Sequence, residues 1–213
     1  MFEQTVSQRL LLALEKLSGF DSVAGQFYLA GGTALSLLIG HRKSEDIDLF
    51  TFEKFDVEKI TNVLLQHSGT VKETANQTVH GTLNDAKVSF LYYPYPLVAD
   101  SEKKEWIYKI KLASMQDIAC MKLLAISQRG EKKDFYDLYE ILKSVSMTAL
   151  RMLLEKKYGA GKFNLYAVVR SLTYFDDAET SPAPESLNNT KWTDVKKFFL
   201  QNEKKFTSEL ISE

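Results

Sequence analysis

The sequence of 213 residues predicts an α+β fold, with a small mixed β-sheet in the N-terminal half and an all-helical C-terminal half. Short β-branched and aromatic runs lie before residue 113, whereas apolar residues at helical spacing fill the chain after Ser114. Hydrophobic residues make up 45% of the chain and charged residues 26%, which excludes a disordered or low-complexity protein. We therefore expect an α/β domain over residues 1–113 and a helical domain over residues 114–213.

The N-terminal half is expected to alternate helices with strands. Val6, Leu10 and Leu14 recur at helical spacing, and Gly31-Gly32 ends a short apolar run that has the pattern of a strand. The expected elements are a helix at 4–17, a strand at 27–30, a helix at 33–39 that stops at Gly40, a strand at 46–50, and a helix at 55–66 with Asp56 as its N-cap.

Residues 69–91 have the composition of a strand meander that extends this sheet. Three β-branched or aromatic runs, at 71–74, 78–82 and 87–91, are separated by a turn-forming pair such as Asn84-Asp85. One more strand is expected at 106–112. The helices expected after it lie at 115–128, 133–143, 148–157, 164–174 and 193–208, the first with Ser114 and Asp117 in a variant of the capping box.

Charge and cysteine content exclude several classes of protein. With 27 basic and 28 acidic residues the formal charge is −1, so no overall polycation is available to coat a nucleic acid or an anionic membrane. The single cysteine, Cys120, excludes a multi-cysteine zinc site, and we expect a small buried apolar side chain there. The apolar run at 10–14 is too short for a secretory signal, and no stretch is long enough to span a bilayer. The sequence therefore predicts a cytoplasmic protein with no membrane partner.

Gly31, Gly32 and Thr33 follow an expected strand and open an expected helix. A turn without side chains lets backbone N–H groups approach an anion, and the N-terminus of the following helix favours negative charge. No Gly-Lys-Ser/Thr follows at the spacing of a P-loop, and a simple tight turn has the same pattern. Phosphate binding and a tight turn both fit these three residues.

Asp46 and Asp48 are two residues apart on an expected strand, so both carboxylates should project from one face of the sheet. Two neighbouring carboxylates repel each other unless a hard divalent cation such as Mg²⁺ lies between them, although a solvent-exposed polar face has the same pattern. Thirteen residues lie between Gly32 and Asp46, enough for one helix and a return strand. This spacing would bring the glycine turn beside the acidic pair, and we expect Arg42 and Ser44 to supply further phosphate contacts.

A third charged group lies in the helical half and consists of Lys122, Arg129, Lys133, Asp134 and Asp137. Lys122 and Arg129 are seven residues apart, which is two turns of one helix, and therefore point the same way. Lys122 has apolar neighbours in the sequence, so its ammonium must reach solvent or meet an acid or a phosphate. Interhelical ion pairs and a phosphate-binding site both fit this pattern.

Together these segments resemble the AbiEii/AbiGii group of nucleotidyltransferase toxins, within the DNA polymerase β-type nucleotidyltransferase superfamily. The resemblance rests on the runs 28–35, 42–50 and 122–138. It implies a metal-dependent enzyme with Mg²⁺ or Mn²⁺ as cofactor, in which a hydroxyl of an RNA (tRNA-like) or of a protein attacks the α-phosphorus of a nucleoside triphosphate and pyrophosphate leaves. It also implies the toxin of a toxin–antitoxin or abortive-infection system, with a possible cognate antitoxin.

The resemblance and the charge pattern together assign roles to residues. Asp46 and Asp48 would ligate the metal ion and, with Lys122 and Asp137, would be catalytic. The helical domain would complete the active-site cleft of a nucleotidyltransferase-like α/β domain. The nucleotide would be bound by Gly31, Gly32, Thr33, Arg42, Ser44, Arg129, Lys133 and Asp134.

One position departs from the resemblance. Many nucleotidyltransferases have a third carboxylate on a later strand, and the corresponding run at 86–90 has Ser89 instead. Either the helical Asp137 substitutes for that carboxylate, or the chain is a non-catalytic nucleotide-binding module of the same fold that has lost its general base. The three histidines, at positions 41, 67 and 80, have no metal-ligand spacing.

Overall fold

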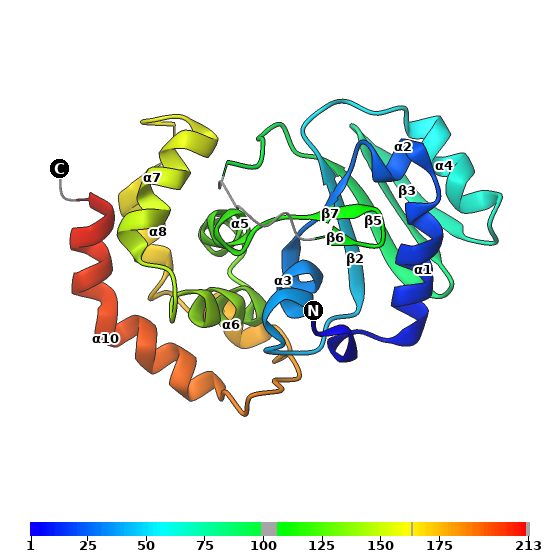
Figure 1. The fold of residues 1–213 in the computed structure, drawn as a ribbon. Coiled ribbons are helices and arrows are strands. Elements are labelled where there is room, and N and C mark those ends of the chain that lie inside the picture. The colour runs from blue at the N-terminus through cyan, green and yellow to red at the C-terminus, as the bar shows by residue number, and fades with distance from the viewer. Residues whose placement is uncertain (99–105, 163, 212–213) are drawn as a thin grey trace. The chain divides into compact units, whose positions relative to one another are not determined.

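The structure is a computed structural model that describes residues 1–98, 106–162 and 164–211. These residues form two compact units, one from 1–96 and 106–114 and the other from 97–98 and 115–211. A mixed sheet with helices makes up the first unit, and helices make up the second (Figure 1). The predicted α+β fold class is confirmed.

Seven strands of the first unit's described residues form one sheet, in the order β3-β4-β5-β2-β1-β7-β6. β2 lies between β5, to which it is parallel, and β1, to which it is antiparallel, so the strand with the acidic pair is central. The strands are β1 (Tyr28–Leu29), β2 (Asp46–Thr51), β3 (Thr70–Ala75), β4 (Thr78–Leu83), β5 (Ala86–Tyr92), β6 (Trp106–Ile107) and β7 (Ile110–Leu112).

One face of the sheet is apolar and forms the core of the first unit. Ile47 and Leu49 of β2 and Phe90 of β5 are fully buried, and α1 packs on both strands. Because side chains alternate across a strand, the residues between them project from the opposite face. The helical elements are η1 (Glu3–Thr5), α1 (Gln8–Ser18), α2 (Asp21–Ala24), α3 (Gly31–Ile39) and α4 (Val57–Leu65).

Local hydrogen bonds fix where the helices of the first unit begin. The backbone N–H of Leu10 donates to the Ser7 hydroxyl at 3.4 Å, so the first helix begins at Gln8 and not at residue 4 as predicted. The carboxylate of Asp56 accepts from the Lys59 N–H at 3.0 Å, which confirms the predicted N-cap of α4. The helix predicted at 33–39 begins earlier than expected, because the glycine pair forms the first turn of α3.

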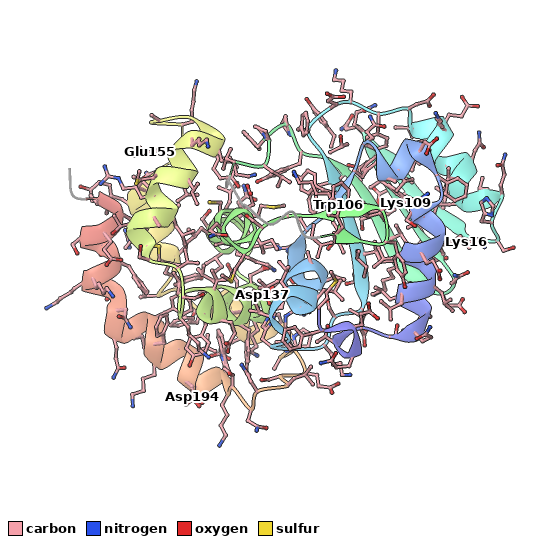
Figure 2. All side chains as sticks on the ribbon, in the orientation of Figure 1. Lys16, Trp106, Lys109, Asp137, Glu155 and Asp194 are labelled. Atoms are coloured by element: carbon pink, nitrogen blue, oxygen red, sulfur yellow. The ribbon has the colours of Figure 1, made fainter. Side chains whose placement is uncertain are left out.

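The single strand predicted at 106–112 is wrong, because this segment forms an antiparallel hairpin of β6 and β7. Tyr108, at φ 52°, and Lys109 lie between the two strands. Neither residue is a usual turn former, so composition gave no turn signal there. The hairpin's Trp106 and Lys109 are exposed (Figure 2).

The second unit is helical, and its predicted helices all form, the one at 115–128 with the predicted bounds and the others with shifted ends. Its aromatic core joins α6 to α10, since the Phe135 ring lies 5.5 Å from the Phe199 ring and 5.7 Å from the Trp192 ring between centroids. The helices are α5 (Met115–Gln128), α6 (Lys132–Ile141), α7 (Met147–Tyr158), α8 (Leu165–Ser171), α9 (Asp176–Thr180) and α10 (Trp192–Ile211). Across the described residues, no helix combines the length and apolar character that a membrane span requires.

A buried ion pair and its neighbours bind residues 97–98 to the helical unit by hydrogen bonds. The Lys157 ammonium lies 3.0 Å from the Asp117 carboxylate, and both side chains are almost fully buried. Asp117 also accepts from the Val98 N–H at 3.0 Å, while Lys156 donates to the Val98 carbonyl at 2.9 Å. A buried charge needs such partners, so the pair explains why this segment belongs to the second unit.

Cys120 is buried one turn beyond Asp117, as the sequence predicted for a small apolar side chain. Burial, together with the Asp117 charge, raises the pKa of the Cys120 thiol to about 12. Since the thiolate is the reactive form, we expect a thiol-specific disulfide reagent to label the native protein at least about 100-fold more slowly than the chain unfolded in guanidinium chloride. Equal labelling rates, followed by absorbance of the released thiol, would contradict this environment.

Candidate functional site

The first turn of α3 is built by the two glycines. Gly31 has φ 69°, in the left-handed region that glycine adopts without a steric penalty. The N-cap residue, Ala30, makes no side-chain capping bond to the helix. The first N–H groups of a helix have no intrahelical acceptor, so the backbone of Gly31, Gly32 and Thr33 presents donors and the positive end of the helix dipole to an anion.

Asp48 lies against this turn. The Ala30 N–H donates to the Asp48 carbonyl at 3.2 Å, and a Cβ added to Gly31 would lie 3.3 Å from Asp48 Oδ2. The carboxylate can approach the backbone this closely because position 31 has no side chain. The predicted convergence of the glycine turn and the acidic pair is therefore present within the first unit.

Thr33 holds the start of α3 to the start of β2. Its buried hydroxyl donates to the Asp46 carbonyl oxygen and lies 2.7 Å from the Ser44 hydroxyl. The hydroxyl is thus engaged inside the protein, so a phosphate contact by Thr33 would come from its backbone N–H. Ser44 is beside this bond and completes the attachment of helix to strand.

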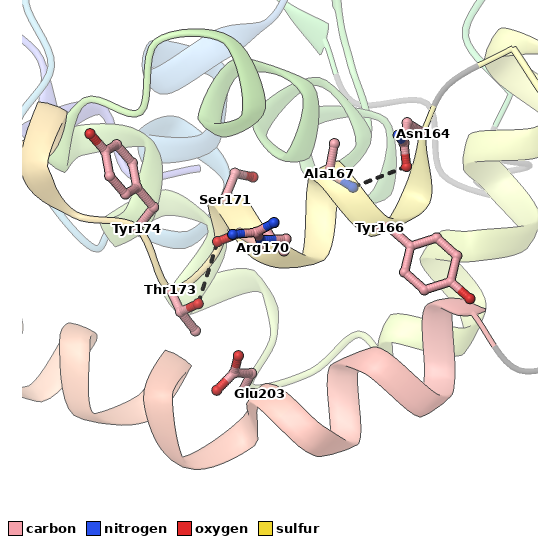
Figure 3. A pocket seen from close by; sticks show the side chains of 8 residues that line it. All are labelled: Asn164, Tyr166, Ala167, Arg170, Ser171, Thr173, Tyr174 and Glu203. Carbon is pink, nitrogen blue, oxygen red and sulfur yellow. Dashed lines mark hydrogen bonds between the residues drawn. The ribbon is translucent and has the colours of Figure 1, made fainter.

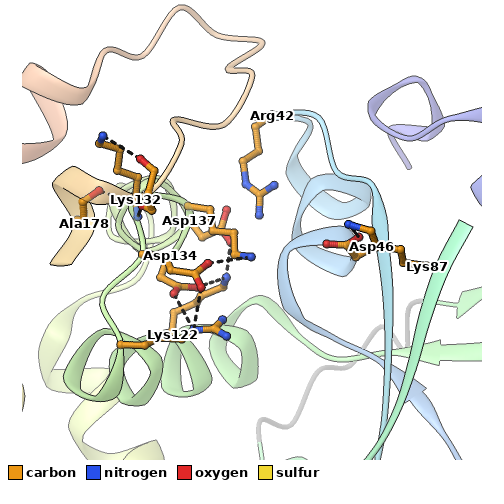
Figure 4. Close-up of polar contacts among 12 residues, drawn as sticks. Arg42, Asp46, Lys87, Lys122, Lys132, Asp134, Asp137 and Ala178 are labelled. Atoms are coloured by element: carbon orange, nitrogen blue, oxygen red, sulfur yellow. Dashed lines mark hydrogen bonds and ion pairs between the residues drawn. The ribbon is translucent and has the colours of Figure 1, made fainter. Parts of the chain in front are cut away.

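Asp46 carries a carboxylate oxygen whose hydrogen-bonding capacity is not used. Its Oδ1 atom is buried and has no hydrogen-bond partner. The Lys87 ammonium lies 3.8 Å from Oδ1, with the two side chains 70% and 45% exposed (Figure 4). An exposed pair at this distance is weak, so the carboxylate remains available to a stronger cation.

The acidic pair matches the donor set of a magnesium ion that is bound together with a phosphate. Within the described residues, no group of three or more His, Cys, Asp or Glu side chains could hold a metal ion. Mg²⁺ is usually bound by one or two carboxylates, with water and substrate phosphates as its other ligands. Asp46 and Asp48 are therefore better suited to bind an ion that arrives with a nucleotide than to form a permanent metal site made of protein ligands alone.

Arg42 places a positive charge over the glycine turn. Its side chain is buried, and its Nη1 donates to the Lys43 carbonyl at 2.8 Å. A Cβ added to Gly32 would overlap Arg42 Nη2, so the guanidinium occupies the space that a side chain at position 32 would take. Arg42 thus adds a cationic donor to the backbone N–H groups of α3.

In the helical unit, Lys122 of α5 joins two buried carboxylates of α6. Its ammonium lies 2.7 Å from Asp134 Oδ1 and 2.6 Å from Asp137 Oδ2, and both aspartates are fully buried (Figure 4). Arg129, whose side chain is 55% exposed, adds a contact of 3.4 Å from Nε to Asp134 Oδ2. Figure 2 contrasts Asp137, inside this unit, with Asp194, which is exposed on α10. The interhelical ion pairs that the sequence allowed are present, and the nucleotide contacts remain a prediction.

Lys133 lies outside this cluster. Its ammonium pairs with Glu131 at 2.9 Å, and its side chain is 42% exposed. Lys133 precedes Asp134 by one residue, which is about 100° around the helix, so these two side chains leave α6 in different directions.

Ser89 lies in the run where the sequence predicted a serine in place of a third carboxylate. Strand pairing sets Ser89 of β5 directly beside Asp48 of β2 and beside His80 of β4. His80 Nδ1 lies 3.1 Å from Ser89 Oγ. Spacing along the sequence gives no signal for His80, because only the order and register of the strands bring it beside Ser89.

A cavity of about 680 Å³ lies in the helical unit between α8 and α10 (Figure 3). Tyr166, which is largely exposed, and Glu203 contribute to its wall. None of the residues predicted for catalysis or nucleotide binding is among the described residues that line it: Asn164, Tyr166, Ala167, Arg170, Ser171, Thr173, Tyr174 and Glu203.

Replacing Lys122 by methionine is expected to destabilise the helical unit strongly. The change removes the cation shared by two buried carboxylates, and breaking such a pair costs about 3–5 kcal/mol. Chemical denaturation gives the change in the free energy of unfolding. The matched control is Lys133→Met, where loss of an exposed pair should cost less than about 1 kcal/mol. Equal effects of the two substitutions would contradict the energetic role of the cluster.

Comparisons with known proteins agree with this architecture. The family model "Nucleotidyl transferase AbiEii toxin, Type IV TA system" matches residues 13–209. An uncharacterized protein of Aquifex aeolicus is 37% identical over an alignment of 205 residues that covers 91% of this chain and 94% of that protein.

Two solved structures share the fold. JHP933 from Helicobacter pylori is 16% identical with a TM-score of 0.54, over 96% of this chain and 94% of that one. The nucleotidyltransferase toxin MenT4 from Mycobacterium tuberculosis is 15% identical with a TM-score of 0.51, over 95% of this chain and 94% of that one. Because the family model spans most of the sequence, the chain belongs to the AbiEii nucleotidyl transferase toxin family of type IV toxin–antitoxin systems and is a nucleotidyltransferase.

Proposed function

We propose that this nucleotidyltransferase uses Mg²⁺ (or Mn²⁺) to transfer a nucleoside monophosphate from a nucleoside triphosphate to a hydroxyl of an RNA or of a protein. We also propose that it is the toxin partner of a cognate antitoxin and acts in the cytoplasm. The observation that carries the proposed chemistry is the Asp46 carboxylate, whose Oδ1 accepts no hydrogen bond and has only a weak, exposed ion pair with Lys87. This carboxylate lies on the same strand face as Asp48, beside the first turn of α3.

The first turn of α3 is proposed to bind the triphosphate. Backbone N–H groups of Gly31, Gly32 and Thr33 donate to phosphate oxygens, and the helix dipole favours their negative charge. The Arg42 guanidinium adds a charged donor at the same turn. These groups are fixed before the substrate binds, so they cost little reorganisation when charge moves onto the leaving pyrophosphate.

Asp46 and Asp48 are proposed to hold the metal ion. When bound, Mg²⁺ neutralises charge on the phosphates and polarises the α-phosphoryl group. The two aspartates fix the position of the α-phosphorus relative to the turn, because β2 is held to α3 through the Thr33 hydroxyl and the Ala30 N–H. Positioning and charge stabilisation account for most of the catalysis of phosphoryl transfer.

Lys122 and Asp137 of the helical unit are proposed to take part in the reaction, with nucleotide contacts from Arg129, Lys133 and Asp134. The short ion pairs support this role for Lys122, because they hold its ammonium in one position. Lys122→Arg keeps the positive charge. Because a guanidinium has a different shape from an ammonium, we expect a larger relative loss of transfer rate than of the free energy of unfolding.

Loss of either β2 carboxylate should abolish nucleotidyl transfer. Asp46→Asn and Asp48→Asn keep the volume of the side chain and remove its charge, so we expect the rate to fall at least about 100-fold while the fold is retained. The measurement is transfer of label from each α-³²P ribonucleoside triphosphate to total RNA or total protein in the presence of Mg²⁺. The labelled fraction identifies the acceptor class.

The matched control for this experiment is Asp85→Asn, in the exposed turn between β4 and β5. Its rate should stay within about twofold of the wild type, because asparagine also tolerates the left-handed backbone at that turn. Magnesium-dependent nucleotide binding without any label transfer would favour the non-catalytic module over the enzyme.

A side chain at position 32 should weaken nucleotide binding. Gly32→Ala places a methyl group where the Arg42 guanidinium lies, so the guanidinium must move away from the turn. We expect the Kd for a nucleoside triphosphate with Mg²⁺ to rise about tenfold by calorimetry, the usual effect of losing one charged hydrogen bond. Gly19→Ala, at the C-cap of α1, is the control and should leave the Kd unchanged.

A further inference from the structure

The proposed reaction needs a group that accepts the proton of the attacking hydroxyl. Asp46 and Asp48 are proposed as ligands of the metal ion, and a carboxylate that shares its electrons with a cation is a weaker base. The next proton acceptor on this face of the sheet is His80. We propose that His80, acting through the hydroxyl of Ser89, is the general base of this nucleotidyltransferase; this inference rests on the proposed function.

Strand pairing sets Asp48, Ser89 and His80 in one row across the sheet. Asp48 of β2 pairs with Ser89 of β5, and Ser89 pairs with His80 of β4. Directly paired residues of neighbouring strands project from the same face, so all three side chains lie on the face opposite the apolar core. Neighbouring strands are about 4.8 Å apart, which puts Ser89 one strand from the metal-binding carboxylate and His80 two strands from it.

The core on the other face fixes this row. Val79 of β4, Val88 and Phe90 of β5 and Leu49 of β2 are almost fully buried. A slip of one residue in either strand pair would bury the polar side chains and expose these apolar ones. The alignment of His80 with Ser89 therefore follows from the packing of the sheet.

The contact between His80 and Ser89 has the chemistry of a proton relay. With Nδ1 unprotonated, the imidazole accepts the Ser89 O–H at 3.1 Å, and Ser89 Oγ keeps lone pairs for the proton of an incoming hydroxyl. The acceptor oxygen then bonds to the α-phosphorus as the bond to the β-phosphate oxygen breaks. Pyrophosphate leaves with the electron pair, the acceptor's proton passes to Ser89 Oγ, and the Ser89 proton passes to His80 Nδ1.

Charged groups of both signs face this row. Glu73 of β3 is the strand partner of His80, and Lys87 of β5 lies two residues before Ser89 on the same face. Asp48 is the strand partner of Ser89, and Asp46 is the partner of Lys87. These charges lie near the row in the wild type and in the His80 and Ser89 variants alike, so the test compares variants with the wild type and does not depend on an absolute pH.

The first test is the pH dependence of nucleotidyl transfer by the full chain. General bases typically contribute about 100-fold to 10,000-fold, so His80→Gln should lower kcat by at least about 100-fold near neutral pH. The wild-type rate should rise with pH and then level off, and His80→Gln should lose this inflection. The Kd for the nucleoside triphosphate with Mg²⁺ should stay within about twofold, because His80 does not contact the glycine turn or the acidic pair.

The second test restores a base by another route. A carboxylate at position 89 would lie beside Asp48 on the same strand face, so Ser89→Asp introduced into His80→Gln should recover at least about tenfold of the lost rate. Ser89→Ala, which breaks the relay but keeps His80, should lower kcat without changing the Kd. The matched control is His67→Gln, whose ring packs on Phe20 away from this row and whose loss should leave the pH profile unchanged.

The outcomes separate this inference from the proposed function. A His80→Gln variant with wild-type kcat and an unchanged pH profile, in a protein whose activity still requires Asp48, would overturn the role of His80 alone. Transfer that persists in Asp48→Asn would overturn the proposed site and the relay with it. Loss of rate in His80→Gln with recovery by Ser89→Asp would support the relay, because a merely structural histidine would not be replaced by a carboxylate on the neighbouring strand.

Discussion

The attachment of α3 to β2 is the constraint on which the site depends. The Thr33 hydroxyl donates to the Asp46 carbonyl, and the Ala30 N–H donates to the Asp48 carbonyl, so the helix begins at the strand that carries both carboxylates. Each bond is worth only about 1 kcal/mol. Their importance is geometric, because they hold the N-terminus of α3 beside the strand that carries the two carboxylates.

β2 is apolar on one face of the sheet and acidic on the other. The strand is central in the sheet, and Ile47 and Leu49 are fully buried on one face. A strand buried on one face in this way can carry charge on the other, and the carboxylates there repel each other in the absence of a cation. This repulsion is the electrostatic reason why a divalent ion that arrives with a nucleotide should be bound tightly at Asp46 and Asp48.

The helical unit uses charge differently. Lys122, Asp134 and Asp137 are buried and paired with one another, so their mutual attraction offsets the cost of removing them from water. Hydrophobic residues of similar volume would often be as stable, so these buried charges are weak evidence for stability, and their part in nucleotidyl transfer is our proposal. The largely exposed Arg129 extends the cluster toward solvent.

Local patterns predicted most of the fold and the residues of the glycine turn and acidic pair. The period of two in β2 predicted that Asp46 and Asp48 share a face, and the glycine pair predicted the turn. Three features could not be read from local sequence. The helices α2 and α9 are too short for a periodic pattern. The Thr33 hydroxyl is engaged by a partner thirteen residues away, and His80 meets Ser89 only through strand register. Long-range pairing decides such contacts, and spacing within one segment carries no signal for them.

The most direct test of this account is electron paramagnetic resonance of Mn²⁺ bound with a non-hydrolysable nucleoside triphosphate. The account predicts a bound ion that is coupled to phosphorus nuclei of the nucleotide, with much weaker Mn²⁺ binding when the nucleotide is left out. It also predicts that both signals are lost in a variant lacking the two β2 carboxylates. A phosphorus-coupled ion that persists in that variant would contradict it, because the ion would then be held elsewhere in the protein.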